Sequence, residues 1–134
     1  MSETSFSDSF LALLPLPLVV VKEVKDDLNH PLVYINNRFK EIIGWELNEI
    51  PDKNTWWLKA YPDPSYQKVV VRQWELAVEV ANHDGVSIVM MEVNIQTKTN
   101  GEQRFKVYSE RKSSFIDGHY VVIFEPQRRS NSEP

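Results

Sequence analysis

The alternation of apolar and polar residues in the first third of the chain predicts a β-hairpin followed by a short helix. Residues 18–24 are mostly β-branched, and a second strand-like run at residues 32–35 follows a turn-prone polar segment. Asn36 or Asn37 then suits the N-cap of a helix that carries apolar residues on one face. Gly44 is typical of the position at which such a helix ends.

The middle of the chain has a helical pattern. Residues 46–60 predict short helical pieces around Pro51. The longest helix follows them, because Asp63 suits an N-cap and Pro64 suits the first helical position. Apolar residues then recur at helical spacing up to residues 84–85, which predicts about five turns at 3.6 residues per turn.

Three further strands are predicted at residues 86–98, 102–113 and 119–125. Gly101 and Gly118 lie between them and supply the positive φ angles that tight turns require. The last strand, like the first, has apolar residues in both of its alternating sets. This indicates central strands that are covered on both faces.

The two ends of the chain differ from the middle. Residues 1–15 predict a short amphipathic helix stopped by Pro15, whereas residues 126–134 predict a disordered polar tail. The main domain therefore spans residues 16–125. The N-terminal helix either covers the sheet of its own subunit or packs against a second chain. Its apolar stripe provides the candidate dimer-interface residues Phe6, Phe10, Leu13 and Leu14.

Composition narrows the class of protein. A chain of 134 residues with 42% hydrophobic and 25% charged residues is typical of one globular domain. Its net charge of −4 argues against a nucleic-acid partner, which needs a concentrated basic surface. No apolar run is long enough to cross a membrane as a helix, and the first residues lack the basic region of a secretory signal. We therefore expect a cytoplasmic protein without membrane insertion.

The residues that carry most enzyme and metal chemistry are absent or badly spaced. The chain has no cysteine, which excludes disulfides, thiolate metal sites and cysteine nucleophiles. Two of the three histidines, His30 in a predicted turn and His119 at a predicted strand start, are not spaced for a metal. The candidate acid–base residues Asp26, Asp27, Asp52 and Asp63 fall in predicted loops or helix caps, without a histidine or a hydroxyl nucleophile at a meaningful spacing. We expect no catalytic residue, no metal site and no enzymatic activity.

Three segments together resemble the PAS family of sensory domains. Residues 34–45 resemble the family segment in which Asn, Phe and Gly recur at fixed spacing. Residues 61–64 are similar to the motif that opens the long helix of the family, and residues 100–105 resemble its Asp-Gly hairpin. The matching positions of the first segment are Asn36, Phe39 and Gly44, with Trp45 in place of the usual Tyr.

The resemblance implies an α+β fold: a five-stranded antiparallel sheet in the order 2-1-5-4-3, with helices on one face enclosing a small apolar pocket. The family's usual C-terminal Asp motif is missing, and Pro126 stands near its place. The chain is thus either a piece of a larger sensor or a free-standing module. The candidate pocket residues are Phe39, Ile43, Trp56, Tyr66, Val70, Trp74, Met91, Val93, Phe105 and Val107. A packed core is the better interpretation of each of them, and a ligand-lined cavity is the alternative.

The missing cysteine also limits cofactor chemistry. A cysteinyl–flavin adduct and a thioester-bound chromophore are both excluded. We expect no cofactor, with non-covalent flavin and haem as the alternatives. His83 is the one candidate haem ligand, and a surface position at a helix end is the better interpretation of it.

The resemblance implies a bacterial signal-sensing module, such as those of two-component systems, which binds a small ligand or a protein partner and transmits by a shift in conformational populations. It favours a homodimer, with a histidine kinase or diguanylate cyclase output domain as candidate partner.

Two alternatives for the function of the chain stay open. One alternative is a ligand-free dimerisation module, and the other is a small cone-shaped enzyme of the ketosteroid-isomerase type. The hairpin ahead of the helices counts against the second.

Overall fold

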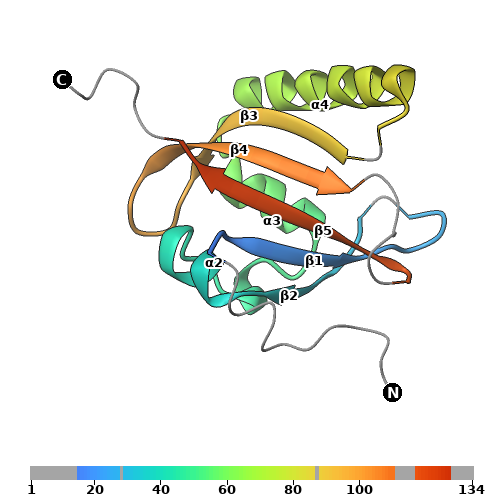
Figure 1. The fold of residues 1–134 in the computed structure, drawn as a ribbon. Helices are drawn as coiled ribbons and strands as arrows, with labels where there is room; N and C mark the ends of the chain where they lie inside the picture. The colour runs from blue at the N-terminus through green and yellow to red at the C-terminus, as the bar shows by residue number, and fades with distance from the viewer. Residues whose placement is uncertain (1–14, 28, 87, 111–116, 128–134) are drawn as a thin grey trace.

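The computed structural model describes residues 15–27, 29–86, 88–110 and 117–127. Five strands form one antiparallel sheet with helices behind it in Figure 1. The strands are β1 (Leu18–Lys22), β2 (Leu32–Ile35), β3 (Ile88–Gln96), β4 (Glu102–Glu110) and β5 (His119–Pro126). The helices are α2 (Asn37–Ile42), the 3₁₀ turn η1 (Leu47–Glu49), α3 (Lys53–Ala60) and α4 (Pro64–Asp84).

The sheet has the order β2-β1-β5-β4-β3, which confirms the predicted order. The first and the last strand of the chain lie side by side in the centre of the sheet, where β1 pairs with β5 and Val20 lies opposite Val121. β3 and β4 pair over their full lengths, with Val93 opposite Phe105. The predicted strand over residues 86–98 is too long at its far end, because Thr97 turns the chain by bonding to the Gly101 carbonyl.

Side-chain caps start the helices where the sequence indicates. Asn36 caps α2, Asp52 caps α3 and Asp63 caps α4, each by accepting a hydrogen bond from a backbone amide of the first turn. α4 runs for 21 residues and ends at Gly85, which has a φ of 70°. Figure 1 shows α4 running along β3, the edge strand of the sheet, while α3 lies behind the central strands.

Both faces of the central strands are buried. Val19 and Val21 join the main core between the sheet and the helices, whereas Leu18, Val20 and Val121 form a second cluster on the opposite face. This explains the apolar residues in both alternating sets of the first and last strands. The apolar stripe of the predicted N-terminal helix, with Phe6, Phe10, Leu13 and Leu14, lies outside the described residues. The same is true of residues 128–134 of the predicted tail over residues 126–134, whereas Pro126 is the last residue of β5.

No helix in the described part of the chain is long and apolar enough to cross a membrane.

Candidate functional site

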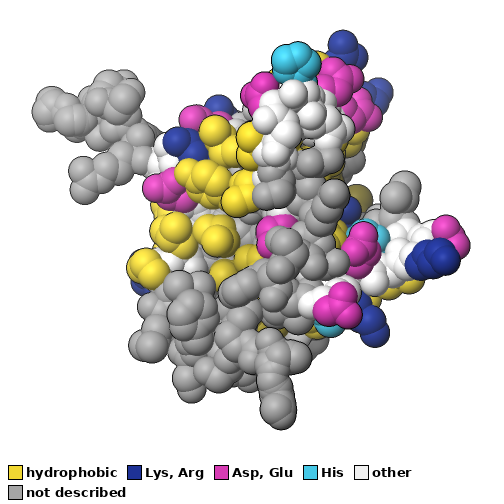
Figure 2. Space-filling view, turned by 45° about the vertical axis from the view of Figure 1, so that its right-hand side comes forward, with side chains coloured by type: hydrophobic (Ala, Val, Ile, Leu, Met, Phe, Trp, Pro, Cys, Tyr) yellow, Lys and Arg dark blue, Asp and Glu magenta, His cyan; other side chains and the backbone are white. Residues whose placement is uncertain are grey.

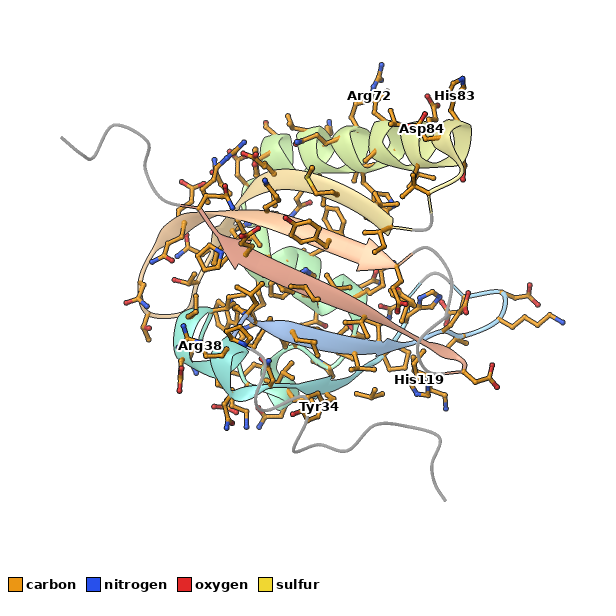
Figure 3. All side chains as sticks on the ribbon, in the orientation of Figure 1. Tyr34, Arg38, Arg72, His83, Asp84 and His119 are labelled. Carbon is orange, nitrogen blue, oxygen red and sulfur yellow. The ribbon has the colours of Figure 1, made fainter. Side chains whose placement is uncertain are left out.

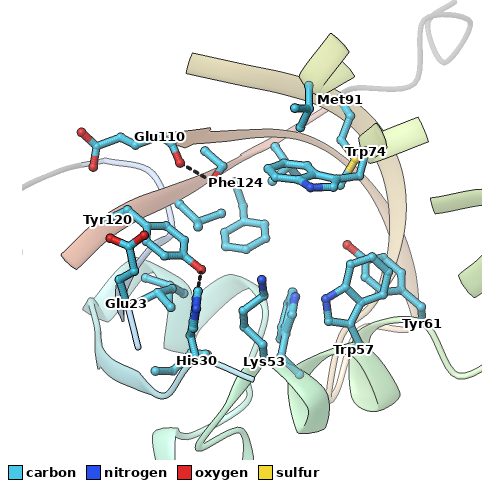
Figure 4. A pocket seen from close by; sticks show the side chains of 18 residues that line it. Glu23, His30, Lys53, Trp57, Tyr61, Trp74, Met91, Glu110, Tyr120 and Phe124 are labelled. Carbon is cyan, nitrogen blue, oxygen red and sulfur yellow. Dashed lines mark hydrogen bonds between the residues drawn. The ribbon is translucent and has the colours of Figure 1, made fainter. Parts of the chain in front are cut away.

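A cavity of about 460 Å³ lies between the inner face of the sheet and helices α3 and α4 (Figure 4). Pockets of 300–1,000 Å³ with mainly apolar walls are typical of small-molecule sites. All five strands contribute to its wall. The lining residues are Val19, Val21, Glu23, His30, Leu32, Lys53, Trp56, Trp57, Tyr61, Trp74, Val78, Met91, Val107, Ser109, Glu110, Tyr120, Val122 and Phe124.

Aromatic rings form much of the wall. Trp56 and Trp57 come from α3, and Trp74 comes from α4. Trp56 packs edge-on against Phe124 of β5, with 5.4 Å between the ring centroids, and Trp57 contacts Tyr61 at 4.9 Å. These contacts hold the rings in fixed positions around the cavity.

Four polar groups point from these walls into the cavity. Figure 4 shows the Lys53 ammonium, the ring nitrogens of Trp57 and Trp74 and the Tyr61 hydroxyl directed toward its interior. Burial lowers the pKa of Lys53, because the charged form loses hydration. Tyr61 is only 2% exposed, and its burial raises the pKa of its hydroxyl far above the usual value. Both groups are thus held in a region of low polarity.

The mouth of the cavity contains a histidine–tyrosine pair. His30 Nδ1 lies 2.8 Å from the Tyr120 hydroxyl, and the two rings meet edge-on. Burial and the nearby Glu23 carboxylate raise the pKa of Tyr120 to about 12. Glu110 also borders the mouth and accepts a hydrogen bond from the Val121 amide at 2.9 Å. The mouth is therefore polar, while the interior is aromatic.

The structure divides the ten predicted pocket residues into three groups. Four line the cavity: Trp56, Trp74, Met91 and Val107. Five lie in the solid core beside it with no exposed surface: Phe39, Ile43, Val70, Val93 and Phe105. Tyr66 lines a separate, smaller hollow, where its hydroxyl accepts a hydrogen bond from the Asn94 amide at 2.9 Å.

The prediction of pocket residues missed most of the polar lining. Lys53, Trp57 and Tyr61 were available from the sequence, because they recur every four residues and so share one side of a helix. His30 and Tyr120 are 90 residues apart, and nothing in their local sequence pairs them. His83 is not part of the site. Its side chain is 90% exposed at the end of α4 and points away from the protein in Figure 3.

Comparisons with known proteins identify the fold. No family model matches the chain, and no curated protein matches its sequence. Solved structures do match. An RNA-binding Light-Oxygen-Voltage receptor aligns with a TM-score of 0.58 and 17% identity, covering 88% of this chain and 31% of that one. The Rhodobacter sphaeroides LOV protein aligns with a TM-score of 0.62 and 14% identity, covering 94% of this chain and 68% of that one.

A third structure, from work on a flavin analogue and the mechanism of a Light-Oxygen-Voltage domain, has a TM-score of 0.59 and 13% identity, and covers 92% of this chain and 86% of that one. These neighbours have the PAS fold, which is therefore the fold of this chain. They also contradict the expectation that the domain has no cofactor. All three are Light-Oxygen-Voltage proteins or domains, and one of them was studied with a flavin analogue. Non-covalent flavin was the alternative to that expectation, and no single residue of the sequence points to it.

Proposed function

We propose that this PAS-fold chain is a signal-sensing module that binds a small ligand in the cavity between the sheet and helices α3 and α4. The observation that carries the proposal is the cavity itself, which combines aromatic walls with polar groups that point inward. A module that acts only by protein contacts has no need of such a space, and packed interiors normally leave few voids larger than a water molecule. The proposed module has no catalytic activity of its own.

Flavin is the first ligand to test, because the structural neighbours are Light-Oxygen-Voltage domains. The residues around the cavity fit it. Trp57 and Trp74 offer ring faces, and the Tyr61 hydroxyl and the indole N–H groups can donate to the oxygen and nitrogen atoms along the ring edge. When bound, flavin would supply light absorption or redox chemistry. The chain has no cysteine to form a covalent adduct, so its flavin would be held non-covalently.

The central strands connect the cavity to the outside of the sheet. Val19 and Val21 line the cavity, while Leu18 and Val20 on the same strand belong to the cluster on the opposite face. A ligand that shifts β1 or β5 therefore changes the outer face as well. In this proposal the outer face transmits the signal to a second copy or to an output domain by a population shift.

Exposed apolar residues extend this outer face toward the edge of the sheet. Ile88 and Met90 of β3 are 50% and 47% exposed. Figure 2 shows hydrophobic side chains gathered on one side of the molecule. Surfaces of this kind are typical of protein contacts.

An enzyme of the ketosteroid-isomerase type is set aside, because the chain has the sheet order and the leading hairpin of the PAS fold.

The test is a native mass spectrum and an absorbance spectrum of protein purified without added ligand. The expected result is an excess mass that is lost on denaturation, with a band near about 450 nm if the ligand is flavin. Val78→Trp places a large ring at the cavity wall and should abolish retention. Val80→Trp is the control, since Val80 lies on the same helix, is 60% exposed and does not line the cavity.

Either of two results would overturn the proposal. One is an unliganded mass that persists when flavins and aromatic acids are added at high concentration. The other is ligand retention that survives Val78→Trp unchanged in a folded protein, because the ligand would then be bound elsewhere.

A further inference from the structure

We propose that the ligand is a planar aromatic anion, with its anionic group bound by Lys53 and its acceptor atoms bound by Tyr61, Trp57 and Trp74. The inference rests on the proposed function and specifies its ligand by chemical class. It follows from the polar groups on the α3 and α4 side of the cavity, which can all donate hydrogen bonds.

The donors in the wall have no hydrogen-bond partner among the residues that the structure describes. Among the hydrogen bonds and ion pairs of the described residues, none involves the Lys53 ammonium, the Tyr61 hydroxyl or the ring nitrogens of Trp57 and Trp74. Lys and Trp side chains can only donate, and a buried donor without an acceptor is unfavourable. The hydroxyl of Tyr61 is the most telling of these groups, because the residue is 2% exposed and points into the cavity. A ligand that carries several acceptors would satisfy all four groups together.

Lys53 determines the charge of the ligand. It is the first residue of α3 and lies near the positive end of that helix, where a cation is disfavoured and an anion is favoured. Its side chain is partly buried and forms no ion pair with any described residue. Burial also lowers the pKa of Lys53, because the charged form loses hydration. An anionic group beside the ammonium would compensate for that loss.

The acidic residues at the mouth do not fill this role. Glu110 is engaged with the Val121 amide at 2.9 Å. Glu23 acts on Tyr120, whose pKa it helps to raise. Figure 4 shows both carboxylates on the side of the cavity away from Trp57 and Tyr61. The anion therefore belongs on the α3 side of the mouth, next to Lys53, with the ring body extending between the indoles.

The shape of the wall favours a flat ring system. Trp57 from α3 and Trp74 from α4 approach the space from two sides, and Phe124 of β5 forms the floor. Aromatic ligands stack on or meet the edges of such rings with favourable geometry. Flavin mononucleotide and simple aromatic carboxylates share this chemistry of a planar body and an anionic group. Riboflavin has the same ring as flavin mononucleotide but no anion.

The experiment measures the affinity of the full chain for two matched pairs of probes by calorimetry. The pairs are flavin mononucleotide with riboflavin, and 2-naphthoate with 2-naphthylmethanol. At least one anionic probe should bind about tenfold or more tightly than its neutral partner, as expected for a charge-assisted contact. Binding by flavin mononucleotide alone would identify a flavin, and binding by 2-naphthoate alone would identify an aromatic acid.

Matched variants locate the contact. Lys53→Met should remove the preference for the anion, whereas Lys68→Met, which deletes an exposed lysine of α4, should leave it intact. Tyr61→Phe should weaken the anionic and the neutral probe equally, since it removes a donor and no charge. Lys53→Met should fold, because it replaces a partly buried charge by an apolar chain of similar length. Should it not fold, Lys53→Gln and the loss of the preference in high salt provide the same test.

Two outcomes distinguish a failure of this inference from a failure of the proposed function. Equal affinity for charged and neutral probes, unchanged by Lys53→Met, overturns this inference and leaves the proposed sensory function standing. Failure of every probe to bind, together with an unliganded native mass, overturns both.

Discussion

His30 Nδ1 lies 2.8 Å from the hydroxyl of Tyr120, and this pair joins two segments that are 90 residues apart in the sequence. His30 precedes β2, and Tyr120 lies at the start of β5. Both side chains border the mouth of the cavity, so their contact connects the edge of the sheet with its centre at the point where a ligand would enter. Tyr120 also makes the protein sensitive to alkaline conditions, because its burial and the nearby Glu23 carboxylate raise the pKa of its hydroxyl.

The first prediction concerns that sensitivity. Tyrosine has an ordinary pKa of 10.0, and in the folded protein the pKa of Tyr120 is raised to about 12. A group whose pKa is raised by folding contributes stability that is complete below pH 10 and is lost as the pH rises toward 12. Urea unfolding at pH 9, 10 and 11 should therefore show a smaller decline for Tyr120→Phe than for the wild type. Parallel declines would show that Tyr120 ionises as easily in the folded protein as in the unfolded chain.

The second prediction concerns Asn36, which joins the start of β1 to the start of α2. Its Oδ1 accepts hydrogen bonds from the amides of Leu18 and Phe39, both at 3.0 Å. Asn36→Ala removes a helix cap and leaves a buried amide unpaired, so it should lower the free energy of unfolding by about 2–4 kcal/mol. Asn37→Ala is the matched control on an exposed neighbour and should change it by less than about 0.5 kcal/mol. Equal effects in urea denaturation would refute the proposed role of the cap.

The third prediction concerns Gly44, which turns the chain after α2 with a φ of 92°. A Cβ at this position would lie 3.1 Å from the Cβ of Lys98. Gly44→Ala combines an unfavourable backbone conformation with this contact and should cost about 1–3 kcal/mol. Gly101 also has a positive φ, of 72°, but has open space around it. Gly101→Ala should therefore cost less in thermal denaturation, and a larger cost there would contradict the contact argument.

The fourth prediction concerns Asp52, the N-cap of α3, whose pKa is lowered mainly by the hydrogen bond from the Thr55 amide. A lowered pKa contributes stability that is present above the ordinary value of 3.8 and is lost as the pH falls through the folded value. Asp52→Ala should cost about 1 kcal/mol at pH 7. The difference from the wild type should shrink in urea denaturation at pH 3. A constant difference between pH 7 and pH 3 would show that the negative charge of Asp52 does not contribute to stability.

The local structure of the protein could be read from its sequence because it depends on local rules. Asp63 caps α4 as predicted, Asn36 is the one of the two candidate caps that begins α2, and α4 ends at Gly85, where the helical pattern ends. These positions follow from the sequence because the groups that a cap satisfies lie within one helical turn. The order of the sheet came from a family resemblance, and the two-sided apolar pattern of β1 and β5 agreed with central positions. The end of β3 was less well predicted, because the turn at Thr97 is made by its contact with Gly101 and not by a strand-breaking residue.

The cavity could not be read in the same way. Phe105 and Val107 lie on the same face of β4, yet Phe105 fills the core and Val107 borders empty space. An alternating pattern specifies that both side chains face the helices, and says nothing of how far away the helices lie. That distance is set by the packing of the large rings of α3 and α4 against the sheet.

The amino-acid sequence by itself determined the elements, their caps and the absence of thiol chemistry. Only the tertiary structure decided which apolar residues surround a cavity and that unpaired donors from α3 and α4 meet inside it, because both depend on contacts between segments far apart in the chain.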